Sequence, residues 1–336
     1  MGRHVAGDAP EMDALVEEAI RAIGAEIDAL RVPRLWGVVL GGGYGRGEGG
    51  VFVLQDGAMR LSNDLDFYVV AEEGASGAEL ASIGAALEPV AARWTKRLGV
   101  DVDFCPAKTP WRLHHDEERL MVQELVHGHF DVAGAGGETL FAGIARREPS
   151  ALPWMEAARL MMNRGMGLLL AAARGDAPAP GDQGFVARNI NKCILGAGDA
   201  RLIARGRYAW RIHDRADALG DALYRAAAEW KLRPRAEAVC RWEEARTVWL
   251  EALEEIGGAR DARPCNTPGG DARVGKSPGG RSLFNAARWI ARRRTLGNLA
   301  SLGLDPVERV LRRVRRHIVL RLPISPSLRR DWEVFN

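Results

Sequence analysis

The sequence predicts an α+β fold, in which a small mixed β-sheet with flanking helices is followed by an α-helical bundle domain. Two observations support this fold class. Up to residue 106, short apolar segments with strand character alternate with amphipathic helical segments. From about residue 151 onward, apolar residues recur only at helical spacing, and the 336 residues are enough for two domains.

Helices and strands alternate in the first part of the chain. Apolar residues at helical spacing, with acids near the start, predict a helix over residues 10–31, and a second helix is expected over residues 76–98, before Gly99. The strand-like segments are "RLWGVVLGGG", "DLDFYVVA" and "VDVDFCP". Between the first two, "GVFVLQDGAMRLS" predicts a hairpin with Asp56-Gly57 at its tip.

We expect four regions along the chain. The predicted regions are a sheet domain over 1–150, a bundle of four helices over 151–256, a Gly- and Pro-rich linker over 257–282, and basic C-terminal helices over 283–336. Within the last region, helices are predicted over 283–296 and 305–322. No internal repeat is present.

Composition excludes several classes of protein. The chain has no run of eighteen apolar residues and no apolar segment near its N-terminus, so we expect neither a transmembrane span nor a signal peptide. The expected location is therefore the cytoplasm. The four cysteines are scattered without a C-x-x-C pair, which argues against structural zinc and a disulfide framework. Their positions are Cys105, Cys193, Cys240 and Cys265.

Two predicted strands carry alternating acids. Asp64 and Asp66 are two residues apart, so both side chains point to one face of a strand. Asp101 and Asp103 repeat this pattern on a later strand. Carboxylates that converge from adjacent strands repel one another unless a cation lies among them, and hard oxygen ligands favour Mg²⁺.

The glycine-rich stretch "LGGGYGRGEGG", residues 40–50, follows another predicted strand. A strand, a glycine turn and a helix start together present backbone N–H groups to an anion. Gly42 and Gly43 would let a triphosphate approach the backbone, and Arg46 would meet its charge.

The combination "LGGGYGRGEGG…NDLDFYVV…VDVDF" resembles the polymerase-beta-type nucleotidyltransferases. In that family a Gly-Gly or Gly-Ser pair is followed by Asp-hydrophobic-Asp and by a third acid on a later strand. The resemblance implies that Asp64, Asp66 and Asp103 are catalytic residues that hold Mg²⁺, with two ions expected and with Asp101 as the alternative third acid. The segment between Gly43 and Asp64 is longer than the corresponding segment of the family, and we attribute the additional residues to the predicted hairpin.

The resemblance also implies a function. It predicts an enzyme that transfers a nucleoside monophosphate from a nucleoside triphosphate, such as ATP, to an acceptor hydroxyl. The helical half is similar in style to the second domain of aminoglycoside-type nucleotidyltransferases. In this interpretation Lys192 contacts the triphosphate, with a solvated or salt-bridged lysine as the alternative. Asp199 and Tyr208 are weaker candidates for acceptor or base contacts.

Two other functions remain open at this point. One is a catalytically inactive relative that acts as an antitoxin or regulatory protein, and the other is an RNA-binding tailing enzyme. The acceptor is open as well: an antibiotic, a sugar, a protein side chain or RNA. The predicted helix 305–322 has an apolar stripe and many arginines. Three interpretations of this helix are open: it docks on the bundle, it contacts an anionic membrane surface, or it binds nucleic acid.

Further motif matches carry less weight. "GDARVGKS", residues 270–277, has the spacing of a phosphate-binding loop, but the prolines and glycines around it predict neither the strand nor the helix that such a loop needs. The pairs His114-His115 and His127-x-His129 lack supporting ligands, so surface histidines are expected. Arg312-x₄-His317 resembles the signature of HEPN ribonucleases, at a level close to chance in an arginine-rich helix.

Overall fold

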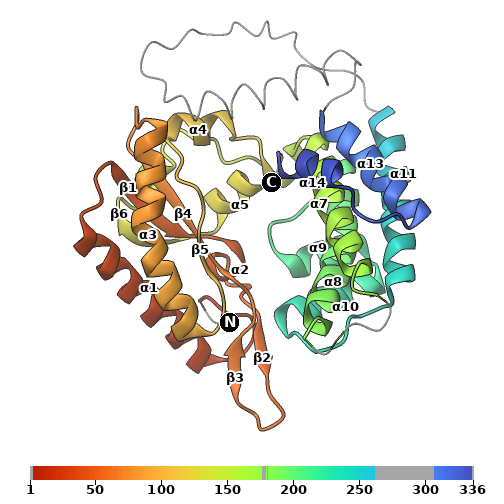
Figure 1. Cartoon of the computed structure of the whole chain (residues 1–336), viewed down its shortest axis with the longest axis horizontal. Coiled ribbons are helices and arrows are strands. Elements are labelled where there is room, and N and C mark those ends of the chain that lie inside the picture. The colour runs from red at the N-terminus through yellow and green to blue at the C-terminus, as the bar shows by residue number, and fades with distance from the viewer. Residues whose placement is uncertain (1–2, 176–178, 180, 262–305, 335–336) are drawn as a thin grey trace, which may run out of the picture. The chain divides into compact units, whose positions relative to one another are not determined.

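The computed structural model describes residues 3–175, 179, 181–261 and 306–334 (Figure 1). The chain forms two compact units. Unit 1 combines Met1–Pro153 with Gly206–Val239, and unit 2 combines Trp154–Arg205 with Cys240–Asn336. The predicted α+β fold is confirmed, because unit 1 contains a mixed sheet and the described part of unit 2 is helical. Residues 206–239, assigned to the bundle from sequence, cluster with unit 1.

A four-stranded sheet forms the centre of unit 1. Its order is β5-β4-β1-β6, and the strands are β1 (Leu35–Leu40), β4 (Leu65–Ala71), β5 (Val102–Phe104) and β6 (Phe130–Gly134). β1 pairs antiparallel with β4 and β6, whereas β4 pairs parallel with β5. The first three strands were predicted, and β6 was not. Because β1 and β4 are antiparallel, the end of β1 meets the start of β4.

Helices α1 (Pro10–Leu30) and α3 (Gly77–Leu98) contact each other and pack on one face of this sheet (Figure 1). α3 begins at a capping box, in which Ser76 and Glu79 satisfy each other's backbone N–H groups. The sheet contributes its alternate residues to this core, among them Leu65 and Phe67. In α1 the buried stripe is Val16, Ile20, Ile23 and Ile27. Leu15 and Leu30, which helical spacing alone places with this stripe, are exposed.

The opposite face of the sheet is covered by short helices. These are α4 (Pro110–His115), α5 (Leu120–His127) and α6 (Gly137–Leu140). They form a second apolar core with Val39 and Val70. Side chains alternate along a strand, so Asp66 and Tyr68 of β4 belong to this second face together with Val70.

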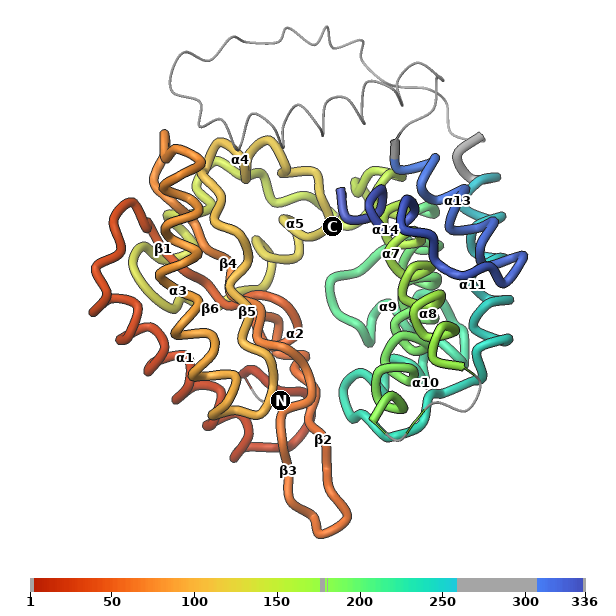
Figure 2. Tube along the Cα trace, in the orientation of Figure 1, coloured from red at the N-terminus to blue at the C-terminus, as the bar shows by residue number. Residues whose placement is uncertain are grey.

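A short helix and a hairpin lie between β1 and β4. The glycine stretch forms the one-turn helix α2 (Gly42–Gly45), and the predicted hairpin consists of β2 (Val51–Val53) and β3 (Met59–Leu61) with Gly57 at its tip. The hairpin is a separate two-stranded sheet that projects from unit 1 (Figure 2). It is therefore not part of the sheet that carries the acids.

The segment 206–239 contributes two helices to unit 1, α9 (Ile212–Leu219) and α10 (Ala222–Leu232). The apolar pattern of "DRADALGDALYRAAAEWKL" in this segment predicts one continuous helix instead. Gly220 adopts a left-handed φ of 68° and ends α9. Asp221 then caps α10 by accepting a hydrogen bond from the Tyr224 N–H at 2.8 Å.

The described part of unit 2 contains four long helices, α7 (Trp154–Ala172), α8 (Gln183–Ala204), α11 (Trp242–Asp261) and α13 (Pro306–Leu320), and the short helix α14 (Pro326–Glu333). The fully buried Trp249 of α11 donates its indole N–H to the Met161 carbonyl of α7 at 2.9 Å. The predicted helix 283–296 and the motif at 270–277 lie outside the described residues. No helix in the described ranges is long and apolar enough to span a membrane.

Candidate active site

Acids of two neighbouring strands meet at one end of the sheet. In the parallel pair β4–β5, Asp66 lies directly opposite Asp103. Asp64 immediately precedes β4, and the Leu65 N–H that follows it donates to the Asp101 carbonyl at 2.8 Å. Asp64 and Asp66 are half-buried, whereas Asp101 and Asp103 are exposed. The structure therefore brings the predicted acids to one edge, on one strand pair.

The glycine stretch closes against the same edge. The Gly41 N–H donates to the Asp66 carbonyl at 2.9 Å, so the chain that leaves β1 is fixed to β4. Gly42 has a φ of 63°, and a Cβ added to it would lie only 2.3 Å from Asp66 Oδ2. Only glycine allows the backbone to approach that carboxylate so closely in this conformation. The first turn of α2 thus begins beside an acid.

Tyr44 ties the glycine stretch to the residues that precede Asp64. Its buried hydroxyl donates to the Gly50 carbonyl at 2.9 Å and accepts the Ser62 N–H at 3.3 Å. Burial, together with the nearby charge of Asp64, raises the pKa of Tyr44 to about 12. Because Gly50 and Ser62 flank the hairpin, Tyr44 closes the base of that insertion.

The acids offer the donor type that Mg²⁺ takes. Burial first, and then the charges of Asp66 and Asp103, raise the pKa of the Cys105 thiol to about 12, which places both carboxylates within electrostatic reach of one point. Among the described residues, no three His, Cys, Asp or Glu side chains gather closely enough to hold a metal by themselves. Mg²⁺ commonly binds through one or two carboxylates plus substrate phosphates, and this donor set fits that mode.

Arg46, predicted to meet phosphate, is engaged with carboxylates of the protein. Its Nη1 lies 3.2 Å from Glu124 Oε2 on α5, and its Nε lies 3.8 Å from Glu48 Oε2. Burial disfavours the charge on Arg46, but Glu124 and Glu48 outweigh burial and hold the pKa of the guanidinium above its ordinary value. The end of the glycine stretch is thereby anchored to α5.

Two more cations from α9 and α10 complete this group, which we call the charge cluster: Arg46, Glu48, Glu124, Arg215 and Lys231. Lys231 Nζ lies 3.6 Å from Glu48 Oε2, and the Glu48 Oε1 accepts the Ile212 N–H at 2.7 Å. The Tyr208 hydroxyl donates to Glu124 Oε1 at 2.9 Å and accepts from Arg215 at 3.2 Å. Tyr208, an acceptor-contact candidate from sequence, thus serves as a link within unit 1.

The charge cluster contains three cations and two carboxylates in a largely buried environment. Burial, followed by the positive charge of Arg46, lowers the pKa of Lys231 to about 8. Burial also disfavours the Glu124 carboxylate, yet Arg46, Arg215 and Lys231 hold its pKa below the ordinary value. Lys231 is therefore the member of the cluster whose charge is least stable.

Sequence reasoning missed Tyr44, Glu124, Lys231 and Glu48. Glu48 and Tyr44 were within the quoted glycine stretch, and Lys231 is a rare lysine in an arginine-rich chain. Glu124 gave no local signal, because its partner Arg46 is distant in sequence. Lys192 and Asp199 lie half-buried on α8, in unit 2, whereas the acids belong to unit 1.

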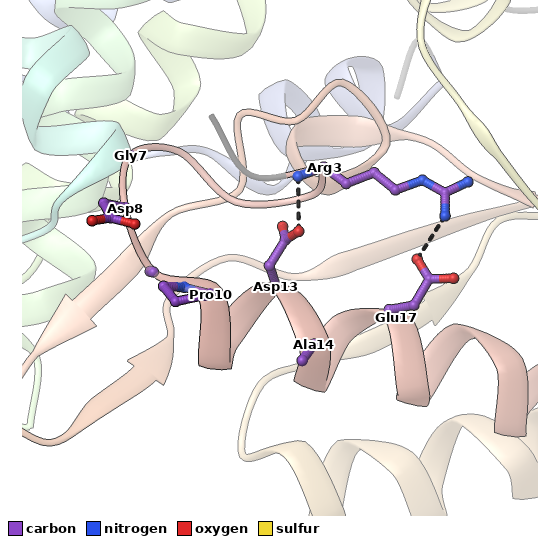
Figure 3. Close-up of a pocket in the computed structure, with 8 residues that line it drawn as sticks. Arg3, Gly7, Asp8, Pro10, Asp13, Ala14 and Glu17 are labelled. Carbon is purple, nitrogen blue, oxygen red and sulfur yellow. Dashed lines mark hydrogen bonds and ion pairs between the residues drawn. The ribbon is translucent and has the colours of Figure 1, made fainter.

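The N-terminal segment forms a separate hollow of about 780 Å³ at the start of α1 (Figure 3). Asp13 accepts backbone N–H groups from Arg3, His4 and Val5. Partial burial disfavours this carboxylate, but the three donors hold the pKa of Asp13 below its ordinary value. Val5 in turn forms a β-bridge with Gly49, so the N-terminal segment that lines the hollow also contacts the glycine stretch.

The predicted surface histidines vary in environment. His114 is exposed and its Nδ1 lies 3.3 Å from Glu117 Oε2, whereas His127 stacks on Trp210 with ring centroids 4.3 Å apart. His129 is half-buried, and its Nδ1 bonds to the Leu125 carbonyl at 2.8 Å. The three described cysteines are free thiols.

Comparison of the chain with protein-family models, with curated proteins and with solved structures found no match. The assignment of function therefore depends on the residues of the site.

Proposed function

We propose that this protein is a Mg²⁺-dependent nucleotidyltransferase, which moves a nucleoside monophosphate from a nucleoside triphosphate to a hydroxyl of a small-molecule acceptor. One observation carries the proposal. Asp66 and Asp103 lie opposite each other on a parallel strand pair, and a Cβ added to Gly42 would lie 2.3 Å from Asp66 Oδ2. A metal ion requires acids and a triphosphate requires a glycine turn, and both lie at one edge of the sheet.

Each part of the site has a separate task in this proposal. Asp64 and Asp66, with Asp103, would hold Mg²⁺, which supplies charge neutralisation for the triphosphate when bound. The backbone at Gly42 and Gly43 receives the β- and γ-phosphates. Arg46 is occupied by two carboxylates, so we assign it the task of fixing this backbone rather than binding phosphate directly.

The reaction is a displacement at the α-phosphorus. The acceptor oxygen forms a bond to that phosphorus, and the bond to the β-phosphate oxygen breaks and releases pyrophosphate. The exposed carboxylate of Asp103 accepts the proton of the hydroxyl. Positioning and charge neutralisation supply most of the rate enhancement in such a transfer.

The hairpin between the glycine stretch and the acids is closed at its base but does not join the sheet of the acids. The Ser62 N–H donates to the Gly50 carbonyl at 3.2 Å, so the chain returns after the hairpin to the point at which it left. In this proposal we attribute the additional residues between Gly43 and Asp64 to an insertion, which forms a two-stranded sheet of its own.

The test is a measurement of pyrophosphate release with Mg²⁺, each nucleoside triphosphate and a panel of aminoglycoside, sugar, peptide and RNA acceptors. We expect release with at least one combination, and Asp103→Asn should lower its rate by about 100-fold or more. Asp214→Asn, an exposed aspartate on α9, is the matched control and should retain the rate.

Triphosphate binding provides a second readout. A nucleoside triphosphate should raise the unfolding temperature only when Mg²⁺ is present, and Asp66→Asn should remove this increase. Pyrophosphate release that survives both Asp64→Asn and Asp66→Asn would contradict the site. Absence of binding and of release under every condition would favour the inactive regulatory protein instead.

A further inference from the structure

Helix α13 is fixed to unit 2 by its apolar side. The predicted stripe is buried in full: Val307, Val310, Leu311, Val314 and Ile318. Gly165 of α7 allows the close approach, because a Cβ there would lie 2.6 Å from Val314 Cγ1. Arg246 of α11 donates to the carbonyls of Ile318 and Val319, both at 3.1 Å, and so holds the last turn. The prediction that this helix docks on the bundle is consistent with these contacts.

The other side of α13 is exposed and has an unusual composition. Arg312, Arg315, Arg316, Val319 and Leu320 are exposed and recur at helical spacing, so they share one face of the helix. The arginines occupy its first part and the apolar residues its end. We call these five residues, together with Leu322, the basic–apolar face.

Exposed apolar side chains are concentrated at this point. Eight large apolar side chains are exposed in the described part of the chain, and three of them are Val319, Leu320 and Leu322, at 39%, 55% and 37% exposure. Arg321 has a left-handed φ of 49°, and the Leu322 N–H bonds to the His317 carbonyl at 2.9 Å. This helix-ending turn holds Leu322 beside the last turn of α13.

No acid of the described residues neutralises the positive charge of this face. Within the described ranges, none of Arg312, Arg315 and Arg316 forms an ion pair. The acids of the adjacent helix α14 are already engaged, because Asp331 pairs with Arg313 and Glu333 pairs with Arg329. An anionic partner would therefore meet three available guanidinium groups.

We propose that the basic–apolar face binds the surface of a bilayer that contains anionic lipids. Arginines attract anionic headgroups, and apolar side chains next to them enter the boundary between headgroups and acyl chains. A nucleic acid backbone would satisfy the arginines but would leave Leu320 and Leu322 against a charged surface. The combination thus favours lipid, and this inference is independent of the proposed enzymatic activity.

The experiment is co-sedimentation of the full chain with vesicles of phosphatidylcholine, with and without phosphatidylglycerol. We expect binding only when phosphatidylglycerol is present, and weaker binding as salt rises. Replacing Arg312, Arg315 and Arg316 by Gln should weaken binding on the order of 100-fold. The double variant Leu320→Ser with Leu322→Ser should weaken it about tenfold without changing the dependence on salt.

A matched control removes the same charge elsewhere. Arg21, Arg60 and Arg207 are exposed in unit 1, and their replacement by Gln should leave vesicle binding unchanged. Equal losses in the control and in the Arg312, Arg315 and Arg316 variant would overturn the proposal in favour of a general charge effect. Binding of single-stranded RNA that depends on these three arginines, with no binding to phosphatidylglycerol vesicles, would also overturn it. Circular dichroism checks that each variant is folded.

Discussion

At the scale of single residues, contact between Gly42 and Asp66 joins the glycine stretch to the acids. Two independent constraints act on Gly42: its φ of 63° disfavours any residue with a Cβ, and the Asp66 carboxylate occupies the space that a Cβ would fill. The sequence suggested a glycine turn at this position. It could not show that the neighbour is a strand residue from beyond the hairpin.

Gly42→Ala should therefore destabilise the protein through both constraints. Gly57→Ala is the matched control, because Gly57 also has a positive φ, of 84°, but nothing lies within 4 Å of the added Cβ. We expect the control to lower the free energy of unfolding by about 1–2 kcal/mol and Gly42→Ala to lower it by more. Urea denaturation of both variants measures the difference. Equal effects would mean that the close approach to Asp66 has no energetic weight.

At the scale of elements, the charge cluster connects α2, α5, α9 and α10 inside unit 1. The side chain of Glu48 joins the end of the glycine stretch to the first residue of α9, Ile212, and to Lys231 on α10. Buried charges are costly unless paired, so removing one partner should disturb the arrangement of all four elements. The cluster is thus a support for the glycine stretch.

Lys231 gives this support a dependence on pH. Its pKa is lowered to about 8 in the folded chain, so between pH 8 and the ordinary lysine pKa of 10.5 the unfolded chain binds more protons. The free energy of unfolding should therefore rise with pH in that window, by up to about 3 kcal/mol from this residue. Below pH 8 both states are protonated, and the contribution does not change with pH.

The measurement is urea denaturation from pH 7 to pH 10.5. Lys231→Met should reduce the rise in the free energy of unfolding relative to the unaltered protein. Lys96→Met, at an exposed position on α3, removes one lysine without touching the charge cluster and is the control. Identical pH profiles for Lys231→Met and the unaltered protein would contradict a lowered pKa at Lys231.

At the scale of the whole molecule, the chain crosses three times between two compact units, at residues 153–154, 205–206 and 239–240. Each unit has apolar side chains of its own that are fully buried. Phe67 is in the core of unit 1, and Trp249 of α11 packs against α7 in unit 2. Separate cores give each unit its own stabilising contacts.

Trp249→Ala should accordingly destabilise unit 2 by about 3–5 kcal/mol. We expect faster hydrogen exchange in α7, α8 and α11, with little change in β1 and β4. Phe67→Ala is the matched variant in unit 1 and should give the reverse pattern. Uniform acceleration across both units by either variant would show that the chain unfolds as one cooperative body.

The sequence by itself determined the fold class, the long helices α1, α3, α7, α8, α11 and α13, the strands other than β6, and the alternation that puts Asp64 and Asp66 on one side of a strand. Helical and strand periodicity are local properties, so the residues themselves encode them. The boundary of the bundle and the break at Gly220 were not predicted correctly, because amphipathic segments do not specify which core receives them.

Only the tertiary structure decided what surrounds the glycine stretch. The Glu48 side chain meets the Ile212 backbone 164 residues further along the chain, and Arg46 pairs with Glu124. These pairs form because segments that are distant in sequence pack together. No periodicity or motif in the sequence predicts such pairs. The sequence therefore identified the acids and the glycines. The tertiary structure decided that Arg46 pairs with a carboxylate of the protein, because a buried guanidinium is costly unless an opposite charge lies beside it.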